Sequence, residues 1–135
     1  MTTVAEIVSG ALELLRVKDA TEAAEAEDMA TGISSLNMMM ARWEANGYSV
    51  GWIPVSNPAD TLPVPPEADE AVMFNLAIRL RPRYGVAIEA DVVDTARRLK
   101  ADVLADVFSS NPMTLEPGLP GFGGRYNVYT DRWEV

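Results

Sequence analysis

The sequence of 135 residues contains neither cysteine nor histidine. Without cysteine there is no disulfide, no thiolate nucleophile and no thiolate zinc site. Without histidine the chain lacks the usual base for a serine nucleophile and the commonest metal ligand. Catalysis would therefore depend on carboxylates, lysine, tyrosine or a cation from solution. We expect a protein that is not an enzyme and that has no cofactor or metal.

Long apolar runs and a basic leader are also missing. No apolar stretch approaches the roughly 20 residues needed to cross a bilayer. The first ten residues, MTTVAEIVSG, have no basic region of the kind that begins a signal peptide. We therefore expect no membrane segment and synthesis in the cytoplasm.

Basic residues are scarce in the first part of the chain. The net charge is -9, and residues 1–78 account for all of it, with twelve acids against three bases. Residues 79–110 hold five acids and six bases. An acidic surface repels phosphate, so tight binding of DNA or RNA is disfavoured, whereas a surface that faces DNA without holding it is compatible with this charge.

Apolar residues recur at helical spacing in four stretches. They predict helices over 4–16, 22–46, from Pro66 or Glu67 to the residue before Pro82, and over 89–109. Thr3 lies three residues before Glu6, which predicts a capping box, and Thr21 is the expected cap of the second helix. We expect an all-α domain of four principal helices over 1–110, with a small β-hairpin arm at 48–64 and an extended C-terminal arm at 111–135.

The arm at 48–64 begins with YSVGWIPV, which is aromatic and β-branched, and it continues into a turn cluster before Pro63 and Pro65. Prolines confine such strands to an edge or a projecting loop. We expect Trp52, Ile53 and Val55 to contact another subunit.

The C-terminal stretch from residue 113 is rich in proline and glycine and ends in RYNVYTDRWEV, which is strand-like and aromatic. Because the helical domain is complete near residue 110, we interpret this stretch as an arm that packs on a partner. The alternative is a disordered or self-packed terminus. The candidate contact residues of the arm are aromatic: Phe122, Tyr126, Tyr129 and Trp133.

Three further groups have a structural interpretation beside a functional one. Three consecutive methionines, 38–40, cannot all face one core, so at least one is expected on an interaction surface. The basic residues are expected on a solvated face or against an acidic neighbouring subunit: Arg79, Arg81, Arg83, Arg97, Arg98 and Lys100. Carboxylate pairs, Glu67 with Glu70 or Glu25 with Asp28, lie in the first turns of helices, where acids favour the helix dipole.

Three segments together resemble the head-to-tail connector proteins of short-tailed phages, also called tail accessory factors or packaged-DNA stabilisation proteins. The segments are ALELLRV at 11–17, SLNMMMARWEANGYSVGW at 35–52 and FNLAIRLRPRYGV at 74–86. The resemblance covers about 4–108 and consists of packing and turn residues such as Trp43, Gly47 and Asn75.

The resemblance implies a structural protein of the virion, located at the head–tail junction. Such connectors add beneath the portal protein after packaging, commonly as twelve copies in a ring. They extend the DNA channel, help to retain the genome, and present a platform for tail nozzle or fibre proteins. In this interpretation the C-terminal arm docks on the portal or on a neighbouring copy, residues 48–64 contact a subunit or the nozzle, and DNA passes without specific binding.

Three alternatives remain open at the level of sequence. An adaptor of a long-tailed phage would do the same work on a related helical domain. A carboxylate-dependent cell-wall glycan hydrolase would use the paired acids as acid and nucleophile. A small regulator would bind a partner helix and form no ring.

Overall fold

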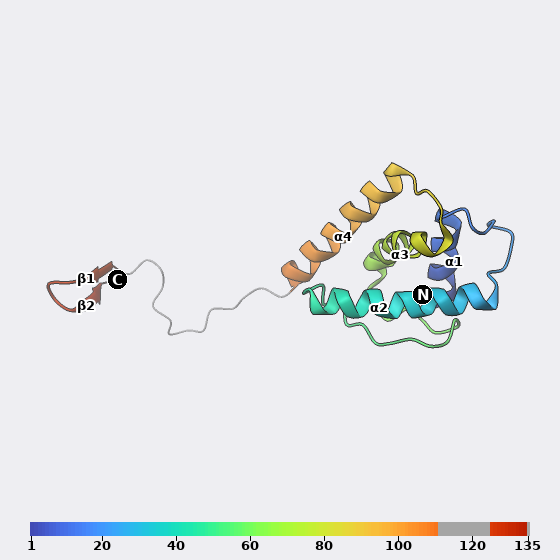
Figure 1. The fold of residues 1–135 in the computed structure, drawn as a ribbon. Coiled ribbons are helices and arrows are strands. Elements are labelled where there is room, and N and C mark those ends of the chain that lie inside the picture. The colour runs from blue at the N-terminus through green and yellow to red at the C-terminus, as the bar shows by residue number, and fades with distance from the viewer. Residues whose placement is uncertain (111–124, 135) are drawn as a thin grey trace.

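The computed structural model describes the backbone of residues 1–110 and 125–134, and the side chains of 1–109 and 128–132. Four α-helices and one 3₁₀ turn fill the first of these ranges (Figure 1). They are α1 (Val4–Leu14), α2 (Ala26–Ala45), η1 (Pro66–Ala68), α3 (Asp69–Tyr84) and α4 (Ala90–Ser110). The predicted set of four principal helices is confirmed.

Helix α3 is the central element, because it contacts α1, α2 and α4. Its apolar face is fully buried at Leu76 and Leu80, and it meets Ile7 and Leu12 of α1 and Leu36 of α2 in one core. Burying side chains of this size supplies most of the stability of a small domain. The core residues of the described part of the chain all lie between Val4 and Val103.

Helix α1 begins at the predicted capping box. The Thr3 backbone N–H donates to the Glu6 carboxylate at 2.7 Å, and the Glu6 N–H donates to Thr3 Oγ1 at 3.3 Å. The next two backbone donors bond to the distant 58–60 segment, with Val4 N–H on the Asp60 carbonyl and Ala5 N–H on the Pro58 carbonyl, both at 2.9 Å. The start of α1 is thus tied both to its own side chains and to a loop far along the chain.

Helix α2 begins four residues later than predicted, at Ala26, and Thr21 is not its cap. The Glu22 N–H donates to the Asp19 carbonyl at 3.1 Å, so residues 19–22 form a turn that uses the backbone groups a helix would need. Glu25 occupies the N-cap position without a side-chain hydrogen bond. The predicted apolar stripe of α2 is confirmed, and the helix ends as expected before Gly47, which has φ +89°.

Pro82 does not end α3, contrary to the prediction. The helix continues to Tyr84 and ends at Gly85, whose left-handed φ of 63° and N–H bond to the Arg81 carbonyl form the cap. A proline in the last turn removes only one backbone donor. Since Pro82 is exposed, its ring also avoids the packed face of the helix.

The predicted β-hairpin arm at 48–64 is wrong. This segment contains no strand, and its one bridge pairs Thr61 with Thr3. Figure 1 shows it running along α2 and returning toward α3, so it does not project as an arm. The physical reason is that Pro54, Pro63 and Pro65 cannot donate to a strand partner, while side chains of α2 bond to the backbone of residues 50–55.

A hairpin does form at the C-terminal end of the chain. Strands β1 (Arg125–Asn127) and β2 (Arg132–Glu134) pair antiparallel, with Tyr126 opposite Trp133 and Asn127 opposite Arg132. Asp131 in the connecting turn adopts φ +48°, a conformation that Asn and Asp tolerate better than most residues. The strand-like interpretation of RYNVYTDRWEV is confirmed over 125–134.

Candidate interaction surfaces

Residues 50–55 are held against α2 by two of its side chains. The Asn37 amide donates to the Val55 carbonyl at 2.7 Å and accepts from the Val55 N–H at 3.0 Å. The Glu44 carboxylate accepts from the N–H groups of Val50 and Trp52, both at 3.0 Å. A side-chain amide and a carboxylate thus replace the neighbouring strand that this extended segment lacks.

With the segment held in this way, its three predicted contact residues, Trp52, Ile53 and Val55, differ in exposure. Val55 is only 8% exposed and belongs to the core of its own domain. Trp52 is partly buried, and its indole Nε1 is enclosed without a hydrogen-bond partner in the described part of the chain. Ile53 is 66% exposed. Of the three, the structure presents the Ile53 side chain most fully to an outside partner.

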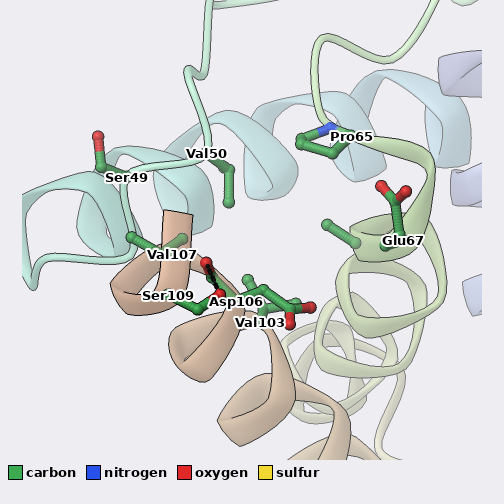
Figure 2. Close-up of a pocket in the computed structure, with 9 residues that line it drawn as sticks. Ser49, Val50, Pro65, Glu67, Val103, Asp106, Val107 and Ser109 are labelled. Atoms are coloured by element: carbon green, nitrogen blue, oxygen red, sulfur yellow. Dashed lines mark hydrogen bonds between the residues drawn. The ribbon is translucent and has the colours of Figure 1, made fainter. Parts of the chain in front are cut away.

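A groove of about 470 Å³ opens beside the C-terminal half of α4. Figure 2 shows side chains of α4 facing those of the 49–50 and 65–68 segments across it. Most of its lining is apolar: Val50, Pro65, Ala68, Val103 and Val107. Phe108, the next residue of α4, is 69% exposed. The groove and Phe108 each present apolar side chains near the C-terminal end of α4.

The rim of this groove is acidic. Glu67 and Asp106 both line it and both are exposed. The last turn of α4 carries no basic residue, so its negative dipole end is not offset by a side chain of its own. A partner that combines apolar side chains with a positive charge would match this surface.

Lys100 of α4 lies over two aromatic rings near the end of α2. Its Nζ is 5.2 Å from the Trp43 ring centroid and 4.9 Å from that of Tyr48, and the two rings are 5.6 Å apart. One member of the predicted basic face is therefore used inside the domain. Arg79, Arg81, Arg83, Arg97 and Arg98 are exposed, and Arg97 pairs with Asp94 at 3.8 Å.

In the described residues, the paired carboxylates do not belong to any group of three or more acidic side chains that could hold a metal ion. Asp28 accepts a hydrogen bond from the Tyr84 hydroxyl at 2.7 Å, which joins the start of α2 to the end of α3. Desolvation of the phenol and the bond to Asp28 raise the pKa of Tyr84 to about 12. Glu67 lines the groove, while Glu25 and Glu70 are exposed at the starts of their helices.

The aromatic residues of the C-terminal arm differ in how far the structure describes them. Phe122 lies outside the described residues. Tyr126 and Trp133 are opposite one another in the backbone register of the hairpin, and their side chains are outside the described part. Tyr129 is in the turn and is 100% exposed, and its neighbour Val128 is 78% exposed.

Sequence reasoning missed four residues that shape these surfaces. Asn37 and Glu44 hold the 50–55 segment, and they are polar residues about two turns apart on the same helix. Gly10 and Gly32 lie at close helix contacts, where a Cβ would fall 2.6 Å from Met73 Sδ and 2.3 Å from Val8 Cγ1, respectively. A glycine within a predicted helix could have been taken as a signal of close packing.

None of the helices in the described ranges is both long enough and apolar enough to cross a membrane. A comparison with curated proteins found no match. The sequence model described as P22 tail accessory factor matches residues 1–133, which extends the earlier resemblance through the C-terminal hairpin. Such factors are structural proteins of a phage virion and associate with other virion proteins. We conclude that this chain belongs to the P22 tail accessory factor family.

Proposed function

We propose that this protein is a head-to-tail connector that assembles as a ring beneath the portal protein. In that position it extends the DNA channel, helps to retain the packaged genome and provides the platform for tail nozzle or fibre proteins. The observation that carries the proposal is the family match over 1–133. Copies made in the host cytoplasm would become part of the virion at the head–tail junction.

The charge of the helical domain supports a channel role. Residues 1–78 carry the whole net charge of -9. A channel wall of the same sign as phosphate lets DNA pass without holding it. The ring, which we expect to contain about twelve copies as a closed cyclic assembly, would place many such surfaces around one axis.

We assign different roles to the helical domain, the C-terminal arm and the 48–64 segment from the burial of their residues. The described core residues lie between Val4 and Val103, which supports residues 1–110 as the connector domain and 111–135 as an arm for docking on the portal or on a neighbour. The arm contributes Phe122, Tyr126, Tyr129 and Trp133. The 48–64 segment contributes contacts through Ile53 and the outer edge of Trp52, while Val55 acts only by holding that segment in place.

Electron microscopy of the purified protein mixed with portal rings tests this proposal. We expect an added ring of density on one end of the portal, and none on portal incubated with an unrelated acidic helical protein. A chain that lacks 113–135 should keep its helical circular dichroism signal and lose the added ring. Portal particles unchanged by the full-length chain would contradict the proposed function.

A further inference from the structure

Arg79, Pro82 and Arg83 form an exposed, positively charged face of α3. Their spacing of three and four residues makes both Pro82 and Arg83 surface neighbours of Arg79. Neither arginine forms an ion pair in the described part of the chain. Arg83 suits the last turn of a helix, but Arg79 is one turn earlier and repels it, because like charges at this spacing destabilise a helix slightly. The pair therefore gives α3 itself little benefit.

Pro82 is also unfavourable for the helix that contains it. Its ring removes a backbone donor from the last turn of α3. Its side chain is exposed and does not belong to the core. Residues that disfavour their own element without a gain in packing are expected at functional surfaces. We therefore interpret the face of Arg79, Pro82 and Arg83 as a contact surface with an apolar ring beside two positive charges.

The groove beside α4 has the complementary chemistry. Its lining includes three valines and two exposed acids: Val50, Val103, Val107, Glu67 and Asp106. Neither acid forms an ion pair with another described residue. Asp106 is close to the C-terminal end of α4, where the helix dipole disfavours negative charge. Because a guanidinium can bond to both oxygens of a carboxylate, two acids beside an apolar lining match two arginines beside a proline.

Two acids near the end of α3 have partners inside the domain. Asp28 accepts the bond from Tyr84, which is one residue after Arg83 and so about 100° around the helix from it. Glu89, in the connection to α4, pairs with Arg16. These acids therefore leave the two arginines of the face available to an outside partner.

The groove and the arginine face lie at opposite ends of α3. The groove includes Glu67 and Ala68, just before the first turn of α3, whereas Pro82 and Arg83 are in its last turn. A helix of 16 residues is about 24 Å long. Figure 1 shows α4 running back from the end of α3, so the C-terminal end of α4 is also distant from that face. The face cannot reach the groove of its own chain, and contacts between different surfaces of successive copies are the kind that close into rings.

We propose that the groove beside α4 receives the arginine face of α3 from a second copy of this chain. The Pro82 ring lies on the valine lining, and Arg79 and Arg83 pair with Glu67 and Asp106. Burial of the apolar groups supplies affinity, and the charges fix which surfaces meet. This inference rests on the proposed ring, and it names the two surfaces through which neighbouring copies contact each other.

Carbodiimide cross-linking, which joins carboxylates to neighbouring amines, tests the contact directly. The full-length Arg83→Lys variant keeps the positive charge and introduces an amine. Isotopically labelled and unlabelled preparations are mixed, with and without portal rings, and linked peptides are identified by mass spectrometry. We expect links from position 83 to Glu67 or Asp106 that join one labelled and one unlabelled chain.

Two controls accompany this experiment. Arg42→Lys places an amine at an exposed position of α2 and should give no link to Glu67 or Asp106. The Lys18–Glu13 pair, with 2.9 Å between its Nζ and Oε1 atoms, should be linked within one chain in every sample and shows that the reagent has acted. An equal yield from positions 42 and 83 would overturn the inference.

Charge reversal with complementation tests the pairing in the ring. One full-length variant carries Arg79→Glu and Arg83→Glu, and another carries Glu67→Arg and Asp106→Arg. Each alone has like charges on both surfaces and should form no ring on portal, although circular dichroism shows a folded domain. An equal mixture should form rings again, because each variant then meets the opposite charge on its neighbour. Rings from either variant alone, or none from the mixture, would overturn the inference.

Pro82→Ala tests the apolar part of the contact. Alanine is favoured over proline in a helix, so urea unfolding should show a domain at least as stable as the unsubstituted one. In the Arg83→Lys background, the same change should lower the yield of the link between chains about fivefold, because apolar area is lost from the contact. An unchanged yield would overturn the assignment of Pro82 to the groove.

The remaining outcomes separate this inference from the proposed function. Links from position 83 only to carboxylates of the portal would assign the arginine face to the portal and overturn the inference. Rings on portal without links from position 83 to Glu67 or Asp106 would overturn it as well and leave the proposed function standing. The expected links without rings on portal would support the contact and contradict the proposed function alone.

Discussion

The side chain of Asn37 bonds to both backbone groups of Val55, as a neighbouring strand would, with distances of 2.7 and 3.0 Å. This one residue of α2 fixes the position of the segment that follows the helix. Both bonds are partly buried, so water cannot fully replace them. These two bonds hold the proline-containing segment around Val55 against α2 as part of the domain surface.

Replacing Asn37 by alanine should therefore destabilise the domain by about 2 kcal/mol, because it leaves the N–H and carbonyl of Val55 without partners. Urea unfolding followed by circular dichroism measures the change. Hydrogen exchange should be faster at the Val55 amide than in the unsubstituted protein. The control is Met38→Ala, since Met38 is the next residue of α2 and is 48% exposed. Equal unfolding midpoints for the two variants would show that the bonds contribute nothing.

The helices were predictable because each depends on local patterns. Apolar spacing predicted the buried faces of α2 and α4, and the Thr3–Glu6 spacing predicted the cap of α1. The 48–64 segment was not predictable in this way. Its sequence is aromatic and β-branched, which favours strands. Its structure depends on Asn37 and Glu44, which reach it only after α2 and the segment pack together.

The groove beside α4 was also beyond prediction. Its lining comes from the 49–50 segment, the approach to η1 and the last turns of α4, which are distant in sequence. Helical spacing showed Val103 and Val107 as members of one apolar stripe. It could not show that Val103 is buried while Val107 is only partly buried and its neighbour Phe108 is 69% exposed. The point at which the apolar residues of α4 become exposed depends on how the other elements pack against this helix, and helical spacing does not give that packing.

Gly32 permits the close approach of α1 and α2. A Cβ at this position would lie 2.3 Å from Val8 Cγ1, and Val8 is fully buried. Alanine is favoured over glycine in a helix by about 1 kcal/mol. We expect Gly32→Ala nonetheless to destabilise the domain by about 1–3 kcal/mol, because the added methyl group would overlap the fully buried side chain of Val8.

Thermal unfolding of Gly32→Ala shows whether the overlap with Val8 outweighs the better helix propensity of alanine. The matched control is Ser34→Ala, an exposed position on the same helix, which should change stability by less than about 0.5 kcal/mol. A more stable Gly32→Ala variant would mean that helix propensity outweighs the steric conflict at Val8.

The bond between Tyr84 and Asp28 makes stability depend on alkaline pH. The pKa of Tyr84 is about 12 in the folded protein, against 10.0 for an unperturbed tyrosine. A raised folded pKa means that the contribution to stability is complete below pH 10 and is lost as pH rises toward 12. Tyr84→Phe should be less stable than the unsubstituted protein at pH 8, and the two unfolding free energies should converge as pH increases.

Urea unfolding at several pH values between 8 and 11 gives the two curves. Asp28→Asn is the matched variant, because it keeps an oxygen acceptor and removes the charge that helps to hold the proton on Tyr84. It should shift the loss of stability to lower pH. Parallel curves for the unsubstituted protein and Tyr84→Phe would show that the Tyr84 hydroxyl is not coupled to folding.

Trp43 is the largest aromatic side chain of the described core and is 3% exposed. Truncation to alanine removes its packing on the core and leaves a cavity. We expect Trp43→Ala to destabilise the domain by about 3–5 kcal/mol. Ile53→Ala is the comparison, since Ile53 is 66% exposed and should cost little. Similar losses in the two variants, measured by urea unfolding, would place the core elsewhere.

Lys100 stabilises the contact between α4 and the end of α2 through the rings of Trp43 and Tyr48. Its ammonium lies 4.9 Å from the Tyr48 ring centroid, within the range in which the electron-rich face of an aromatic ring attracts a cation. Methionine keeps much of the length of the lysine side chain and removes the charge. We expect Lys100→Met to lose about 0.5–1 kcal/mol of stability.

A double-mutant cycle with Tyr48→Leu separates this attraction from packing. The two substitutions should together cost less than the sum of their separate effects, because the second removes a partner that the first has already lost. Additive losses would show that Lys100 packs beside the rings without attraction to Tyr48. The coupling should change little between low and moderate salt, since Lys100 is only partly exposed and is therefore less screened than an exposed ion pair.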